Sequence, residues 1–282
     1  MYKILVTGAS GQLGSELQAI AGQYDYVFHF KDSKELDITN YELFEQFVVD
    51  QNINVIINCA AYTAVDEAES ESELAEAINY LAVEHMAEVA KVHQIKLVHI
   101  STDYVFDGRN HEPYIETDAT NPQSVYGQTK LDGELAMQKV SPSDSLIIRT
   151  SWVYSQFGNN FVKTMLNCAE KRDEISVVAD QIGSPTNAAD LAEVILVILP
   201  KIKSEVVEVY HYSNDGECSW YEFAINIFKK KNLKIKVHPI KSKDFKTRAT
   251  RPLYSKLNNK KIKKRFSLDI KSWKESLGCF QR

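Results

Sequence analysis

The sequence predicts an α/β protein with a doubly wound parallel sheet and a smaller C-terminal lobe. Three observations lead to this prediction. Short apolar runs alternate with helical segments through the first half of the 282-residue chain. A glycine-rich turn, "TGASGQLG" at 7–14, follows the first apolar run, and the alternation becomes irregular after about residue 154. Strands that alternate with helices pair in parallel, which gives a sheet covered on both faces.

The first five predicted strands are short, apolar and rich in β-branched residues, as expected of strands buried on both faces. The first, "KILVT", leads directly into the glycine turn. The five strands are predicted at 3–7 ("KILVT"), 26–30 ("YVFHF"), 55–60 ("VIINCA"), 96–102 ("KLVHIST") and 145–154 ("SLIIRTSWVY").

Helices are predicted between these strands, over 12–22, 39–51, 70–94 and 126–140. Two of them begin with a capping box, in which a Ser or Thr side chain and a Glu three residues later satisfy free backbone N–H groups. One box joins Thr39 to Glu42, and the other joins Ser70 to Glu73. These pairs predict where the second and third helices begin.

The second half continues with fewer elements and ends in a lysine-rich tail. A helix, a strand, a helix and a strand are predicted over 160–172, 175–179, 188–200 and 206–212. The tail contains "KKKNLKIK" at 229–236 and "KKIKKR" at 260–265, which we interpret as solvated surface.

Composition excludes several classes of protein. Lys plus Arg is 33 and Asp plus Glu is 38, and the net charge of −5 argues against nucleic acid as a partner. The apolar run at 194–199 is too short to span a membrane, and the N-terminus has no signal-peptide pattern, so we expect a cytoplasmic protein. We expect reduced thiols, because no two cysteines are close in sequence: Cys59, Cys168, Cys218 and Cys279.

The glycine turn lies between a strand and a helix, which is the setting of the Rossmann-like dinucleotide fingerprint. Its spacing is GxxGxxG. Gly8 would allow the tight turn, Gly11 would let a pyrophosphate approach the backbone, and Gly14 would let helix and strand pack closely. The helix N-terminus would then offer free N–H groups to the phosphates. The turn residues predicted to bind the cofactor are Gly8, Ser10, Gly11, Gln12, Leu13 and Gly14.

The end of the second strand indicates which dinucleotide is bound. An acidic residue that holds the ribose hydroxyls usually stands there. In this chain the position falls on Phe30 or Lys31, and a lysine can meet a 2′-phosphate. Asp37 and Ile38 follow at a distance that places them near the adenine. NADPH is therefore slightly favoured over NADH. We expect 1–154 plus about 187–213 to form the dinucleotide domain, and about 155–186 plus 214–282 to form the substrate-binding lobe.

Tyr126 and Lys130 are candidates for acid–base chemistry. They are four residues apart at the start of a helix, so they share one face of it. A neighbouring ammonium lowers the pKa of a phenol from its ordinary value of about 10, which suits general acid–base catalysis. Thr102 closes the fourth strand, at the edge of the sheet where ligands bind in this architecture. Its hydroxyl can donate a hydrogen bond to a substrate oxygen.

The glycine turn, "NCAAYT" at 58–63, Thr102 and the YxxxK pair resemble the extended short-chain dehydrogenase/reductases. The chain is most similar to those members that reduce a 4-keto-6-deoxy sugar carried on dTDP. The matching segments are "GQLGSEL" (11–17), "ELDIT" (35–39), "NCAAYTAVDEAE" (58–69), "STDYVFDG" (101–108), "YGQTK" (126–130), "RTSWVY" (149–154), "DQIGSPT" (180–186) and "TRPLYSKL" (250–257).

This resemblance implies that NAD(P)H delivers hydride to C4 of dTDP-4-dehydro-L-rhamnose, giving dTDP-L-rhamnose for surface polysaccharide. Tyr126 would protonate the developing alkoxide, and Thr102 would polarise the carbonyl. Lys130 would lower the Tyr126 pKa and hold the nicotinamide ribose. The other implied contacts are Ala60, Ala61 and Tyr62 with the cofactor, and Asp103, Tyr104, Trp152 and Arg251 with the substrate, Arg251 at its phosphates.

Alternative functions stay open at this point. A 4,6-dehydratase needs an Asp–Glu pair after the catalytic Thr, but Asp103 is followed by Tyr104. Another 4-ketoreductase, an epimerase, or a non-catalytic subunit like the regulatory beta subunit of methionine adenosyltransferase are further alternatives. His93 and His99 have no partners at metal-ligand spacing, so we predict no metal site. The expected partner is the sugar nucleotide, and a homodimer stays open.

Overall fold

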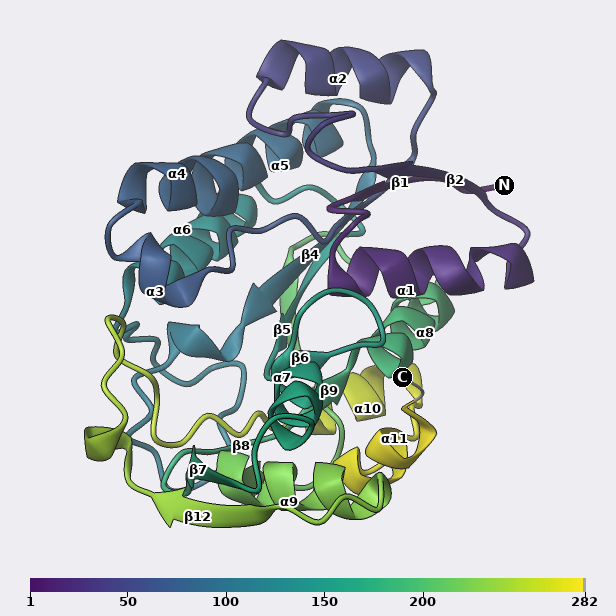
Figure 1. Ribbon diagram of the computed structural model, residues 1–282. Coiled ribbons are helices and arrows are strands. Elements are labelled where there is room, and N and C mark those ends of the chain that lie inside the picture. Colours follow the sequence, from purple (N-terminus) through teal and green to yellow (C-terminus); the bar gives the residue numbers. More distant parts are fainter. Residues whose placement is uncertain (281–282) are drawn as a thin grey trace.

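The computed structural model describes residues 1–280, and a six-stranded parallel sheet lies at its centre (Figure 1). The strands are β1 (Lys3–Thr7), β2 (Val27–Lys31), β3 (Val55–Asn58), β4 (Lys96–Thr102), β5 (Leu146–Thr150) and β10 (Glu208–His211). Their order is β10-β5-β4-β3-β1-β2, and all neighbouring pairs are parallel. The winding reverses between β1 and β3. The predicted doubly wound α/β fold is therefore confirmed.

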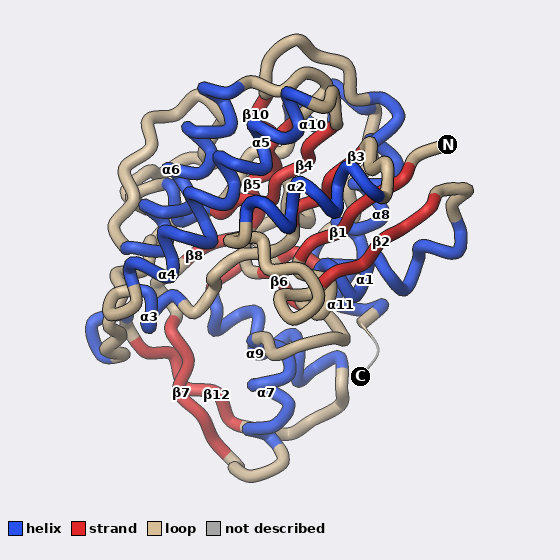
Figure 2. Tube along the Cα trace, turned by 90° about the horizontal axis from the view of Figure 1, so that it is seen from above, coloured by secondary structure: helices blue, strands red, loops and turns tan. Residues whose placement is uncertain are grey.

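Helices cover both faces of the sheet, because successive side chains of a strand point to opposite faces. In β1, Ile4 and Val6 belong to the core on one face, and Leu5 belongs to the core on the other. Figures 1 and 2 show the resulting layers. The helices that supply the first core are α1 (Gln12–Ile20), α8 (Ala188–Ile198) and α10 (Lys260–Phe266), and those that supply the second are α2 (Tyr41–Asp50), α5 (Ala82–Val92) and α6 (Val125–Val140).

Helix α2 begins one residue later than its predicted capping box requires. The side chain of Asn40 is the N-cap and accepts from the Leu43 backbone N–H at 3.2 Å. The Thr39 hydroxyl instead donates to Asp37 at 2.8 Å. The predicted box of Thr39 with Glu42 is therefore wrong, because the Asx turn at Asp37 engages the threonine first.

The helix predicted over 70–94 forms as a continuous run over 72–92, but its predicted start at Ser70 is wrong and a π turn interrupts the regular winding. The hydroxyl of Ser70 donates to the Glu67 carbonyl at 3.0 Å, so it caps no helix. In the wide π turn, Asn79 turns its amide inward and donates to Thr129 of α6 at 3.2 Å. The region consists of α3 (Val65–Ala68), α4 (Ser72–Glu76), a π turn (Ala77–Leu81) and α5.

The strand predicted over 145–154 breaks at Trp152. This residue has a φ of +48°, in the left-handed region that bulky residues seldom occupy. After the break the chain forms β6 (Val153–Tyr154), which pairs with β9 (Thr186–Asn187) outside the main sheet. The chain therefore leaves the main sheet at Trp152 and enters the second lobe.

The second lobe has a core of its own, built around Val162, Phe223 and Trp273. Its elements are α7 (Phe161–Ala169), β7 (Glu174–Val178), β8 (Ile182–Gly183), β11 (Cys218–Ser219), α9 (Trp220–Lys230), β12 (Lys236–Ile240) and α11 (Trp273–Cys279). Strand β12 runs parallel to β7. Within residues 1–280, no helix combines the length and apolar character needed to cross a membrane.

The lysine-rich tail is more structured than the sequence indicates. The segment "KKIKKR" belongs to α10 (Lys260–Phe266), and its apolar residues Ile262 and Phe266 are buried in the core beside α8. The prediction that this segment is solvated surface was wrong for one face of α10, because Ile262 and Phe266, four residues apart, face the sheet. The place of β10 beside β5 supports our proposal that 187–213 belongs with 1–154.

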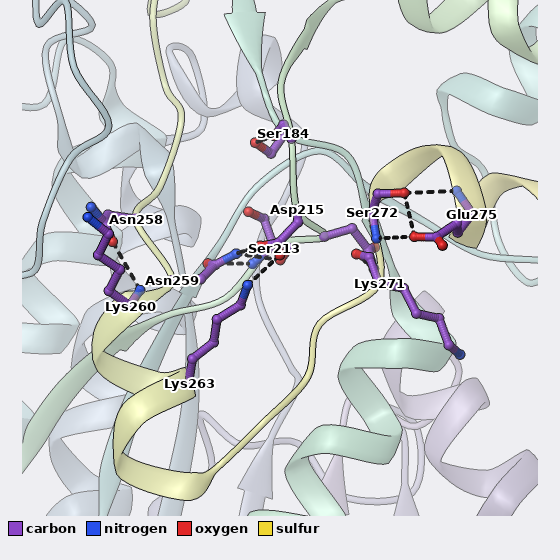
Figure 3. A network of polar contacts seen from close by, with 12 residues as sticks. Ser184, Ser213, Asp215, Asn258, Asn259, Lys260, Lys263, Lys271, Ser272 and Glu275 are labelled. Atoms are coloured by element: carbon purple, nitrogen blue, oxygen red, sulfur yellow. Dashed lines mark hydrogen bonds and ion pairs between the residues drawn. The ribbon is translucent and has the colours of Figure 1, made fainter.

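A polar network ties the tail to the loop after β10 (Figure 3). Asn259 donates to the Ser213 carbonyl at 2.8 Å, and its own amide oxygen accepts from the Ser213 N–H at 3.2 Å. Lys263 forms an ion pair with Asp215. The Asp215 N–H donates to the Lys271 carbonyl at 3.0 Å. These bonds hold α10 and α11 against the C-terminal edge of the sheet.

Candidate active site

A cavity of about 730 Å³ opens at the carboxyl ends of the central strands. Open α/β sheets bind ligands there, where the winding reverses. Its wall includes Gly8 after β1, Cys59 after β3, and the last residues of β4 and β5, Thr102 and Thr150. The predicted site residues that line it are Gly8, Ser10, Gly11, Gln12, Leu13, Asp37, Ile38, Ala60, Ala61, Thr102, Asp103, Tyr104, Tyr126, Lys130 and Trp152. Four others do not: Gly14, Lys31, Tyr62 and Arg251.

The glycine turn has the geometry of a phosphate cradle. Gly8 has a φ of +64°, and a Cβ there would lie 2.6 Å from the Ala60 backbone nitrogen. Gly11 is the N-cap of α1 and offers no side chain to its free N–H groups. A Cβ on Gly14 would lie 2.4 Å from the Gly8 carbonyl oxygen, so Gly14 acts through close packing. The bare backbone and helix N-terminus fit the pyrophosphate of a dinucleotide.

Lys31 is the last residue of β2, but its side chain turns away from the cavity. Its ammonium lies 3.5 Å from Glu35 and over the ring of Phe47. Ser33 lines the cavity instead, together with Asp37. The position does not support the predicted contact of Lys31 with a 2′-phosphate, because Glu35, in the turn after β2, already pairs with the Lys31 charge. Ser33 was missed, although its place just after the strand was a usable signal.

Tyr62 is directed outward rather than toward the cavity. Its hydroxyl donates to Glu71 at 2.7 Å, and its backbone N–H donates to Asn79 at 2.9 Å. The neighbouring Thr63 lines the cavity. The cavity position therefore supports the expected cofactor contact for Ala60 and Ala61, but not for the Tyr62 ring.

Helix α6 is held close to the end of β4 by its cap and a glycine. The Ser124 side chain is the N-cap and accepts from the Gly127 N–H at 3.1 Å. A Cβ on Gly127 would lie 2.3 Å from the Tyr104 carbonyl oxygen, so only glycine allows this approach. The result places the first turn of α6 beside Thr102.

Thr102 and Tyr126 both line the cavity, and the Thr102 hydroxyl donates to Asp103 Oδ1 at 3.1 Å. Burial raises the pKa of Tyr126 to about 12, against the effect of the nearby Thr102 hydroxyl, which lowers it. The Lys130 ammonium does not lower this pKa as predicted, because its Nζ is directed to the Ile100 carbonyl at 2.6 Å. Tyr126 is thus a protonated phenol at neutral pH, ready to act as an acid.

Asp103 and Tyr104 form the part of the cavity wall that follows β4 and lies beside the first turn of α6. Asp103 is 2% exposed, and burial raises the pKa of its carboxyl to about 6, although Ser255 and Thr102 hydrogen bonds lower it. Tyr104 also lines the cavity, and its ring lies edge-on to that of Tyr126. A carboxyl that is half protonated near pH 6 can donate to or accept from a sugar hydroxyl.

Arg251 lies behind this wall rather than in it. Its guanidinium donates to Asp66 at 2.9 Å and hydrogen-bonds Tyr104. The pKa of Asp66 is lowered, since bonds from the Ala249 backbone and Arg251 outweigh the effect of burial. The position does not support a direct grip of Arg251 on the phosphates, because its charge is already paired.

Trp152 lines the cavity from the second lobe. Its ring stacks on Trp220 with centroids 3.5 Å apart and an interplanar angle of 8°. A Cβ on Gly183 would lie 2.6 Å from Trp152 Cε2, so that glycine makes room for the ring. The stack fixes an aromatic surface at the cavity, which suits the C–H face of a sugar.

Two further lining residues, Gly158 and Asn159, were missed, and no sequence pattern signals them. They reach the site because the Gln12 side chain accepts from Asn160 at 3.1 Å and tethers this loop over the glycine turn. Within residues 1–280, no three His, Cys, Asp or Glu side chains gather as metal ligands would.

The sheet, the glycine cradle and the cavity-lining Thr102, Tyr126 and Lys130 define an oxidoreductase of the extended short-chain dehydrogenase/reductase class. The family model described as RmlD substrate binding domain matches residues 2–281. The chain belongs to this family.

Named relatives agree with this assignment. The chain is 42% identical to the dTDP-4-dehydrorhamnose reductase of Aggregatibacter actinomycetemcomitans, over 98% of this chain and 97% of that protein. It is 39% identical to the spore coat polysaccharide biosynthesis protein SpsK of Bacillus subtilis, over 98% of this chain and 96% of that protein. The crystal structure of the Bacillus anthracis dTDP-4-dehydrorhamnose reductase, in complex with NADP, superposes with a TM-score of 0.94 at 42% identity and covers 99% of each chain.

Proposed function

We propose that this protein reduces the C4 keto group of dTDP-4-dehydro-L-rhamnose to give dTDP-L-rhamnose, with NADPH as the preferred reductant and NADH as the alternative. One observation carries the proposal: Thr102, Tyr126 and Lys130 meet in a cavity that also contains the glycine cradle. The similarity to dTDP-4-dehydrorhamnose reductases across 98% of the chain supports the substrate. The relative SpsK supports a role in polysaccharide synthesis. A cytoplasmic location is part of the proposal.

Different residues of the cavity would bind the cofactor, polarise the substrate carbonyl and supply the proton. The turn from Gly8 to Leu13 would hold the pyrophosphate, and Asp37 and Ile38 would face the adenosine end. The bound NADPH supplies the hydride. Thr102 donates a hydrogen bond to the substrate keto oxygen. Tyr126 then gives its proton to the same oxygen, which becomes the C4 hydroxyl.

The direct test measures NADPH consumption by the purified protein with dTDP-4-dehydro-L-rhamnose and with other 4-keto sugar nucleotides. We expect rapid consumption with the first and slow consumption with the rest. If only another 4-keto sugar nucleotide is turned over, the proposed substrate is wrong. If the protein binds NADPH but turns over none of these sugar nucleotides, a regulatory subunit is favoured instead.

Arg251 gives a second prediction about the substrate side. If it leaves Asp66 and grips the phosphates when the sugar nucleotide binds, R251A raises KM for the substrate by about tenfold or more, because charge-assisted bonds contribute roughly 1.5–3 kcal/mol. The Kd for NADPH stays unchanged. Steady-state kinetics and NADPH titration measure both.

The matched control is Asp66→Asn, which frees the guanidinium without removing it. If Arg251 binds the phosphates, the KM for the sugar nucleotide stays unchanged in Asp66→Asn. An equal rise of KM in both variants would instead show that the ion pair only supports the wall behind Tyr104.

A further inference from the structure

A chain of buried polar side chains runs behind the cavity and ends at Lys130. Thr7 of β1, Asn58 of β3 and His99 of β4 are each no more than 1% exposed. The Thr7 hydroxyl donates to Asn58 Oδ1 at 2.7 Å, and Asn58 Nδ2 lies 3.0 Å from His99 Nδ1. His99 Nε2 lies 3.3 Å from Lys130 Nζ. The family resemblance implies that Lys130 holds the nicotinamide ribose, whereas the other three have no role in the proposed reaction.

The orientation of the Asn58 amide is fixed by its neighbours. The backbone N–H of Ala60 can only donate, and it lies 3.1 Å from Asn58 Oδ1. The oxygen therefore accepts from Ala60 and Thr7, and the Nδ2 group must be the donor toward His99.

This orientation selects one tautomer of His99. A ring nitrogen that accepts a hydrogen bond carries no proton, so Nδ1 is bare and the neutral ring has its proton on Nε2. An imidazolium would set two N–H groups against each other at Asn58. Burial and the charge of Lys130 also keep the pKa of His99 well below its ordinary value. His99 therefore presents an N–H to Lys130.

A donor at this place favours the neutral form of the lysine. An ammonium has three donors and no acceptor, whereas a neutral amine has one lone pair. Lys130 Nζ already donates to the Ile100 carbonyl at 2.6 Å. An amine satisfies both contacts, because it donates to Ile100 and accepts from His99.

We propose that His99 is a positioning residue of the reaction: its Nε2–H stabilises the amine form of Lys130 and so sets the pH at which the lysine loses its charge. This inference rests on the proposed function. After Tyr126 gives its proton to the substrate oxygen, solvent returns a proton to the phenolate. Lys130 would hold the nicotinamide ribose, so the reaction depends on its charge state, and His99 sets the pH at which that charge is lost.

The other groups that face Lys130 are consistent with this role. Burial lowers the pKa of Lys130 to about 8, against the raising effect of Glu134 and Cys59. Glu134 is paired with Arg149 of β5, and burial raises the pKa of the Cys59 thiol to about 12, so it is uncharged. Tyr126, on the same helix, is a neutral phenol until it reacts.

The first test reads the tautomer in the wild-type protein by imidazole ¹⁵N–¹H NMR, with the resonances of His99 assigned by their loss in His99→Gln. We expect the proton on Nε2 across neutral pH, and an inflection of the Nε2 shift near pH 8, as Lys130 titrates. The inflection should vanish in Lys130→Met. This readout needs no turnover, so it stands or fails independently of the proposed function. A proton on Nδ1 would overturn the proposal.

The second test follows the alkaline limb of the kcat pH profile in His99→Gln. The glutamine can offer its carbonyl oxygen to the ammonium, so the Lys130 pKa rises and the limb moves up by about one pH unit. The control is His93→Gln, because His93 is exposed and pairs with Glu45 at 2.9 Å, away from Lys130. An unmoved limb in a folded His99→Gln variant contradicts the proposal. If that variant does not fold, the wild-type tautomer and its inflection, with Lys130→Met as the comparison, decide the question.

Discussion

Replacing Tyr126 with phenylalanine is expected to lower kcat by about 10²–10⁴-fold, the usual contribution of a positioned general acid. The substitution keeps the ring, which lies edge-on to Tyr104 at a centroid distance of 5.5 Å, and removes only the hydroxyl. The pKa of about 12 means that the wild-type phenol is protonated at neutral pH and can give its proton to the alkoxide. Single-turnover kinetics and NADPH titration measure the chemical step and the cofactor affinity separately.

The affinity for NADPH should change little, because the hydroxyl is far from the glycine cradle in the proposed mode of binding. Tyr41→Phe is a suitable control, since Tyr41 is exposed and stacks on His85 on the helical face. A normal kcat in Tyr126→Phe would remove Tyr126 from the mechanism, and a matching loss in Tyr41→Phe would show a general effect on folding.

Replacing Glu134 with alanine is expected to lower the free energy of unfolding by about 3–5 kcal/mol, because it leaves a buried charge without a partner. The Glu134 carboxylate accepts three bonds from Arg149, at 2.9, 3.1 and 2.6 Å. The two side chains are 1% and 5% exposed. Arg149 also lies over the ring of Phe106 and beside a neutral His211. Glu116 interacts with its charge as well, but Glu134 is the carboxylate that accepts its hydrogen bonds.

Chemical denaturation of a double-mutant cycle measures this cost. The double variant Glu134→Leu with Arg149→Met should recover much of the lost stability, because replacing a buried ion pair by apolar side chains is often neutral. A Glu134→Ala variant as stable as the wild type, or a double variant worse than the sum of the two single variants, would contradict this account of the pair.

The main sheet was predictable because its chemistry is local. Strands buried on both faces are uniformly apolar, so β1, β3 and β4 are visible in single segments such as 55–58. Local capping patterns were less reliable. The boxes at Thr39 and Ser70 failed, because nearby Asp37 and the Glu67 carbonyl offered those hydroxyls other partners.

The second lobe was harder to predict because its order depends on distant contacts. Trp152 breaks a strand-like run where its ring can stack on Trp220, 68 positions later in the chain. The helix α10 is hidden among lysines, and only Ile262 and Phe266 show its buried face.

In the site, too, the positions fixed by local sequence were predictable, whereas the side-chain directions were not. Thr102, Tyr126 and Lys130 were found because strand ends and helix spacing fix where their backbones lie. The directions of the Lys31 and Tyr62 side chains depend on Glu35 and Glu71, whose choice of partner no spacing rule expresses.

The central claim is hydride transfer to C4 of the sugar, and isotope transfer tests it most directly. The purified protein is incubated with dTDP-4-dehydro-L-rhamnose and with NADPH in which both hydrogens at C4 of the nicotinamide are deuterium, and the product is examined by NMR. We predict one deuterium at C4 of dTDP-L-rhamnose and none elsewhere in the sugar. Deuterium at another carbon, or a sugar product without any deuterium, would contradict the account.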